Sequence, residues 1–135
     1  ATSANQCKAK LQKLKAAVEA HADDIVVAVK QDTRKPEQEI RITEVMNVTA
    51  NIQRNIDNLD DWMAPVNVVP SMNPDDTASI VLEARGVCLI LGPWNFPLGM
   101  VLGPLAAAIA AGNCCMGKEG RRGGMDDNSG KCSAF

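Results

Sequence analysis

The chain has 135 residues, 46% of them hydrophobic, and a formal net charge of −2. This length allows one compact domain, and so apolar a composition excludes a disordered chain. With a nearly neutral charge and only two tryptophans and two phenylalanines, the sequence argues against a nucleic-acid partner.

The chain contains five cysteines and a single histidine, His21. An odd number of cysteines without a CxxC pair predicts free thiols in a reducing compartment and no metal site. The first residues, Ala-Thr-Ser-Ala, indicate processing, and no apolar secretory segment precedes Cys7. We therefore expect an intracellular protein that is not secreted. Its compartment is the cytoplasm, or a mitochondrion or chloroplast after presequence removal.

Residues 5–64 are predicted to form an antiparallel helical pair. Apolar residues at spacings of three, four and seven predict one helix from Asn5 to Thr33. Pro36 suits the first turn of a second helix, which runs to about Met63. The apolar stripes of the two helices should pack against each other. The first stripe is Leu11, Leu14, Val18, Ile25 and Val29, and the second is Val45, Val48, Ile52, Ile56, Leu59 and Met63.

Residues 65–86 read as a connector, because prolines and asparagines in residues 65–77 prevent a continuing helix. A short strand is predicted at Ala78–Ala84, followed by a turn at Arg85-Gly86. The last segment, residues 119–135, is predicted to be a flexible glycine-rich tail.

No charged residue occurs from position 87 to position 117. Val87–Leu91 is typical of a strand that is buried on both faces. A tight turn and a buried helix over Leu98–Ala111 follow, and Gly112-Asn113 ends the helix before a strand that starts at Cys114. Residues 87–118 thus form a βαβ unit, and the fold class is α/β.

A membrane-spanning helix is the alternative interpretation of Leu98–Gly117, since these residues are about long enough to cross a bilayer. Gly99 and Gly103 also have the spacing of small residues in membrane helices. Pro97, Pro104 and the many alanines argue against this alternative.

The run Gly92-Pro93-Trp94-Asn95-Phe96-Pro97-Leu98 resembles the aldehyde dehydrogenase superfamily. Further similarity lies at Gly103-Pro104-Leu105 and Ala110-Ala111-Gly112-Asn113. Upstream segments resemble the class 3, or fatty-aldehyde, branch: Asp32–Pro36, Thr43–Val45, Trp62-Met63 and Gly86-Val87. The resemblance covers about Leu11 to Lys118. It implies that the βαβ unit begins an incomplete Rossmann-like NAD-binding domain.

The resemblance also implies roles for individual residues. Asn95 takes the position that donates an N–H to the aldehyde oxygen, which gains negative charge during the reaction. Trp94 and Pro97 lie in the position that lines the nicotinamide side of an NAD(P) site, and Lys118 in the position that contacts the adenosine ribose.

The family's nucleophilic cysteine and general-base glutamate have no counterpart among these residues. Cys114 and Cys115 are interpreted as small core residues. After Lys118, Glu119-Gly120-Arg121 replaces the family's Pro-Ser-Glu. We therefore expect Asn95 and the cofactor positions to be vestigial, and no cofactor to bind this chain alone.

A βαβ unit alone leaves strand edges and apolar helix faces uncovered. We expect other protein subunits to bury residues 87–117. The first hypothesis is a non-catalytic accessory or structural subunit in a larger complex. The alternatives are the N-terminal part of an active NAD(P)-dependent aldehyde dehydrogenase and a small membrane-associated subunit.

Overall fold

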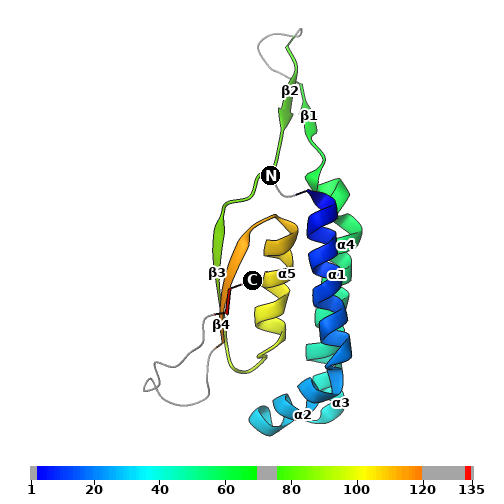
Figure 1. Cartoon of the computed structure of the whole chain (residues 1–135), viewed down its shortest axis with the longest axis vertical. Coiled ribbons are helices and arrows are strands. Elements are labelled where there is room, and N and C mark those ends of the chain that lie inside the picture. Colours follow the sequence, from blue (N-terminus) through cyan, green and yellow to red (C-terminus); the bar gives the residue numbers. More distant parts are fainter. Residues whose placement is uncertain (1–2, 70–75, 120–132, 135) are drawn as a thin grey trace.

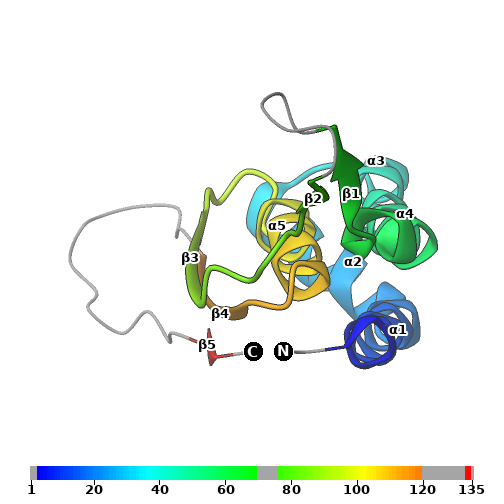
Figure 2. The ribbon, with the colours of Figure 1, turned by 90° about the horizontal axis from the view of Figure 1, so that it is seen from above.

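The computed structural model describes residues 3–69, 76–119 and 133–134 in three layers. One layer is the pair of long helices α1 (Ala4–Ala20) and α4 (Asn47–Met63). The middle layer is helix α5 (Gly99–Ala110), and the third is a small sheet that contains β3 (Val87–Gly92) and β4 (Cys114–Glu119). Seen from above, α5 lies between the sheet and the helical pair (Figure 2). The α/β class and the helical pair followed by a βαβ unit are confirmed.

The predicted first helix is two helices. Helix α1 begins with a capping box between Ser3 and Gln6, and it ends at His21. Helix α2 (Ala22–Thr33) then starts with two aspartates in its first turn, where the helix dipole favours negative charge. The prediction of one continuous helix was wrong because the apolar spacing continues across this break.

The predicted second helix contains a π-helical segment. Pro36 lies just before α3 (Glu37–Ile40), and the segment η1 (Arg41–Met46) leads into α4 without interruption. Between α2 and α3, Arg34 has a φ of 57°, the left-handed conformation that often ends a helix.

Helices α1 and α4 are antiparallel, as predicted. The Lys8 ammonium lies 2.6 Å from the Asp60 carboxylate, and Lys15 Nζ donates to Gln53 Oε1 at 2.8 Å. Most predicted stripe residues are buried, with Leu14 and Ile25 half-buried and Met63 exposed. The core of this layer is Cys7, Leu11, Val18, Val26, Val29, Ile40, Val45, Val48, Ile52, Ile56 and Leu59, with Ala106 and Ala110 from α5.

The described part of the connector contains two strands rather than one. Strand β1 (Val66–Val68) pairs antiparallel with β2 (Ala78–Ile80), which is shorter than the predicted strand Ala78–Ala84. This hairpin extends away from the three layers at one end of the molecule (Figure 1), and its strand residues are exposed.

Strands β3 and β4 are parallel neighbours, and α5 connects them. The helix ends as predicted at Gly112, whose φ is 77°. The amide N–H groups of Gly112 and Asn113 donate to the carbonyls of Ile109 and Ala108, which is a Schellman motif. The Asn113 side chain also accepts from the Gly86 N–H and so ties the start of β3 to the start of β4.

The prediction that the strand Val87–Leu91 is buried on both faces was wrong, because only one face of β3 is buried. Ile90 and Gly92 face α5 and are buried, whereas Val87, Leu89 and Leu91 are 72%, 63% and 67% exposed. Conversely, α5 is largely covered, because the helical pair packs on one side of it and the sheet on the other. Within the βαβ unit the uncovered apolar surface is therefore mainly the outer face of β3, and further apolar side chains are exposed around the β1–β2 hairpin, at Val66, Val69, Ile80, Val81 and Leu82.

The predicted tail begins at Glu119, which is the last residue of β4. Strand β5 (Ser133–Ala134) pairs antiparallel with β4, so this part of the predicted tail forms a strand. Residues 120–132 and 135 of that prediction lie outside the described residues.

Leu98–Gly117, the stretch of the membrane alternative, is divided between α5 and β4. Across the described ranges, no helix combines the length and the apolar character needed to cross a membrane.

Candidate functional site

The predicted site residues lie at the carboxyl edge of the two parallel strands. The Trp94–Pro97 turn follows β3 directly, and Lys118 is the next-to-last residue of β4, paired with Leu91. Trp94, Asn95 and Lys118 are exposed, and Pro97 is half-buried. Exposed and buried residues alternate along β4, and the exposed Lys118 therefore points away from α5. In open α/β sheets, ligands bind at this edge.

Lys35, in the turn between α2 and α3, holds the Trp94–Pro97 turn, which is called the Asn95 turn below. Its ammonium donates to the backbone carbonyl of Asn95 at 2.7 Å and lies 3.5 Å from the centroid of the Phe96 ring. The first contact is a charge-assisted hydrogen bond and the second is a cation–π contact. Together they hold the peptide that joins Asn95 to Phe96 and the Phe96 ring, while Asn95 itself stays exposed.

Glu44, in η1, holds the other end of the turn. It is 0% exposed, and its Oε2 accepts the backbone N–H of Gly99 at 2.7 Å. Gly99 is the first residue of α5, where a carboxylate satisfies an unpaired donor and interacts favourably with the helix dipole. Oε1 of Glu44 is buried and finds no hydrogen-bond partner in the described part of the chain. The buried Glu44 side chain therefore holds the start of α5 against the π-helical segment.

Gly92 allows the turn to be this tight. A Cβ atom at this position would lie 2.5 Å from Cγ2 of Val101 in α5, closer than atoms in contact approach. The end of β3 and the first turn of α5 are thus packed backbone against side chain, which restricts the path of the residues between them.

The sequence interpretation missed Lys35 and Glu44. Both lie in short segments that resemble the family, Asp32–Pro36 and Thr43–Val45. The resemblance therefore marked these segments but did not indicate which side chains contact the turn. The contacts join residues 60 and 55 positions apart in the chain, a pairing that apolar periodicity does not reveal.

Cys114 and Cys115 lie at the start of β4, at the opposite edge of the sheet from Asn95. Cys115 is buried as predicted, but Cys114 is exposed, because successive strand residues face opposite ways. Burial raises the pKa of the Cys115 thiol, and the neighbouring Cys88 and Cys114 raise it further. A raised pKa leaves less thiolate, so Cys115 is a poor nucleophile. Among the described residues, no three His, Cys, Asp or Glu side chains are placed to hold a metal ion.

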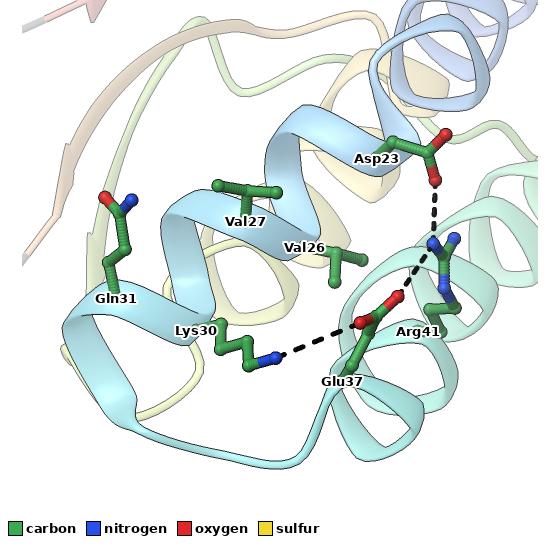
Figure 3. Close-up of a pocket in the computed structure, with 7 residues that line it drawn as sticks. All are labelled: Asp23, Val26, Val27, Lys30, Gln31, Glu37 and Arg41. Atoms are coloured by element: carbon green, nitrogen blue, oxygen red, sulfur yellow. Dashed lines mark hydrogen bonds and ion pairs between the residues drawn. The ribbon is translucent and has the colours of Figure 1, made fainter.

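A separate open pocket of about 430 Å³ lies between α2 and the α3–η1 segment (Figure 3). The Arg41 guanidinium is 2.8 Å from Asp23 and 3.1 Å from Glu37, and hydrogen bonds to these carboxylates raise its pKa. Lys30 is 4.0 Å from Glu37. Because each charge faces an opposite charge, the pocket offers no unpaired group for a charged ligand. The lining residues are Asp23, Val26, Val27, Lys30, Gln31, Glu37 and Arg41.

The fold and the site define a class: a helical pair followed by the first βαβ unit of a dinucleotide-binding domain, with an asparagine-bearing turn at its carboxyl edge. A sequence profile of the aldehyde dehydrogenase family matches residues 1–122. The chain belongs to the aldehyde dehydrogenase family.

Its relatives include members of aldehyde dehydrogenase family 3, which confirms the predicted class 3 similarity. Aldehyde dehydrogenase family 3 comG of Dictyostelium discoideum is 36% identical over 82% of this chain and 24% of its own length. The protein AldX of Bacillus subtilis is 42% identical over 87% of this chain and 26% of its own length.

Solved structures agree with this assignment. The substrate-bound state of Staphylococcus aureus AldH superimposes with a TM-score of 0.83 at 31% identity, over 86% of this chain and 26% of that one. Aldehyde dehydrogenase from Brucella melitensis gives a TM-score of 0.77 at 25% identity, over 87% and 24%. The chain thus spans about a quarter of the length of the relatives that it matches.

Proposed function

We propose that this chain supplies the N-terminal part of the active site of an NAD(P)-dependent aldehyde dehydrogenase. The observation that carries the proposal is the Asn95 turn. It lies at the carboxyl edge of the sheet, and Lys35 and Glu44 hold it from the helical layer. Two side chains from distant segments that fix one exposed turn indicate a site in which the position of Asn95 matters.

The side-chain amide of Asn95 is the group with the relevant chemistry. When a thiolate adds to an aldehyde, the carbonyl oxygen gains negative charge, and a fixed N–H donor stabilises that charge. The thiolate and the base that activates water must come from residues beyond this quarter of the family's length. Asn95 therefore acts in aldehyde oxidation only when it is assembled with them.

The described residues fit part of a dinucleotide site. Lys118, an exposed cation, and the Trp94–Pro97 turn share the carboxyl edge where a cofactor would lie. Lys118 would hold ribose hydroxyl groups, and the turn would line the nicotinamide side of the cofactor site. The described residues include no glycine-rich turn before a helix to bind a pyrophosphate. Calorimetry should therefore detect no NAD(P) binding to this chain alone, and micromolar affinity would contradict that expectation.

A chimera tests the proposal. Residues 1–118 of this chain would replace the matching part of AldX, and NAD(P)H formation from an aldehyde would be followed. We expect an active chimera in which Asn95→Ala lowers kcat by about 10²–10³-fold. Asn47→Ala, at an exposed position at the start of α4, is the matched control and should leave kcat unchanged. A folded chimera whose kcat is insensitive to Asn95→Ala would overturn the proposal.

A second candidate is a non-catalytic structural subunit docked in a larger complex. Two observations favour it: Glu119-Gly120-Arg121 stands in place of the family's Pro-Ser-Glu, and the outer face of β3 is apolar and exposed. The sequence of the full transcript separates the candidates. A reading frame that continues into a nucleophilic cysteine supports the enzyme, whereas a stop codon after Phe135 supports the subunit. The mass of the native complex then identifies what covers β3.

A further inference from the structure

Cys88 and Cys115 are direct neighbours on the parallel strands β3 and β4. The register places the Cα atoms of these two residues opposite each other. Adjacent strands lie about 4.8 Å apart, which falls inside the range of Cα separations that a disulfide can bridge, about 4.4–6.8 Å.

The two thiols also share a face of the sheet. Cys115 is 2% exposed and packs with Ile90 and Leu105 beneath α5, and Cys88 packs against the same cluster. Cys114 is exposed and, by the alternation along the strand, faces the other way. The register and the shared face therefore single out one pair among the described cysteines.

Access to the pair is unequal. Cys88 is half-buried, so a small reagent can reach it, whereas Cys115 is only 2% exposed. The raised pKa of Cys115 points to the same order, because it leaves less thiolate at the buried Cys115.

We propose that Cys88 and Cys115 form a dithiol site, which a low-molecular-weight disulfide such as oxidised glutathione converts into an internal disulfide. The Cys88 thiolate attacks one glutathione sulfur, forms a mixed disulfide and releases the first glutathione thiol. Cys115 gives its proton to solvent, and its sulfur attacks the Cys88 sulfur and releases the second glutathione thiol. Two protein thiols are oxidised while one external disulfide is reduced to two thiols. This reaction is independent of the proposed enzymatic function.

Mass spectrometry of the oxidised chain tests the site. The folded chain is treated with oxidised glutathione, its remaining thiols are alkylated, and chymotrypsin cuts after Trp94 and Leu102 to separate Cys88 from Cys115. We expect a monomer that has lost two hydrogen atoms and a cross-linked peptide pair containing Cys88 and Cys115. A link to Cys7, Cys114 or Cys132, an intermolecular link, or a stable glutathione adduct at Cys88 would overturn the proposal.

Variants provide the controls. Cys114→Ser should form the same cross-link, because this thiol faces away from α5. Cys88→Ser should leave Cys115 unmodified, and Cys115→Ser should stop the reaction at a mixed disulfide on Cys88. Circular dichroism checks that each variant is folded. If Cys115→Ser does not fold, the peptide map of the unmodified sequence decides alone.

Discussion

At the scale of single residues, the exposed Asn95 depends on side chains that are not its sequence neighbours. Lys35 fixes its backbone carbonyl, and Glu44 fixes the start of α5 just beyond the turn. Glu44 is entirely buried, and a buried polar group is costly unless it is hydrogen-bonded. Its bond to Gly99 N–H offsets part of that cost and makes the position of the turn depend on the helical layer.

Replacing Lys35 should loosen this turn. Lys35→Met removes the hydrogen bond to Asn95 and the cation over the Phe96 ring, which together stabilise the turn by about 1 kcal/mol. We expect faster amide hydrogen exchange, measured by NMR, at Met100 and Leu102, whose N–H groups donate to the carbonyls of Phe96 and Leu98. Lys13→Met changes an exposed lysine of α1 and should leave these amides as they are. Equal exchange in both variants would show that Lys35 does not hold the turn.

The Cys115 thiol makes stability depend on pH. Its pKa is raised by burial and by Cys88 and Cys114, so the folded chain holds this proton more tightly than the unfolded chain. The stabilisation is complete below the ordinary thiol pKa of about 8.5, and it is lost as pH rises through the raised folded value. Urea unfolding from about pH 8 to about pH 10 should show a decline that Cys115→Ala reduces. If Cys114→Ala reduces the decline by the same amount, burial of Cys115 is not its cause.

At the scale of elements, apolar periodicity predicted the helical pair and the βαβ unit, because the periodic apolar residues are the ones that form the core. It did not predict the break at His21, where the apolar spacing continues into α2. Nor did it predict the β1 strand, since Val66–Val68 is short and exposed. At the candidate site, the resemblance pointed to Asn95, and its role stays a prediction; the contacts of Lys35 and Glu44 arise only once α5 packs on the helical pair.

Two glycines near α5 should respond to alanine in opposite directions. At Gly92, a Cβ would lie 2.5 Å from Val101 Cγ2, and a β-branched side chain in a helix has little rotamer freedom to move away. Gly92→Ala should therefore lower the free energy of unfolding by about 1–3 kcal/mol. At Gly103, nothing lies within 4 Å of an added Cβ, so Gly103→Ala should raise it by about 0.5–1 kcal/mol through helix propensity. Urea titrations measure both, and a destabilised Gly103→Ala would show hidden crowding on α5.

At the scale of the whole molecule, the three layers bury α5 but leave one side of the sheet uncovered. The helical pair and the inner face of β3 form two clusters that α5 joins through Leu102 and Ile109. The outer face of β3 carries Val87, Leu89 and Leu91, each more than 60% exposed. A βαβ sheet normally has both faces covered, so this surface is where the remaining layer of the family fold, or a partner, would pack.

That face should make the isolated chain self-associate. Contiguous apolar surface on a short sheet promotes pairing between copies, and the concentration dependence of the sedimentation coefficient measures it. Leu89→Lys with Leu91→Lys should shift the chain toward a monomer, because both positions point away from α5 and charge there opposes association. Val27→Lys, at a 56% exposed position on α2, adds charge elsewhere and should leave association unchanged. If the unmodified chain is monomeric at all concentrations and unfolds cooperatively, the outer face of β3 needs no cover, and the argument for a docking partner is lost.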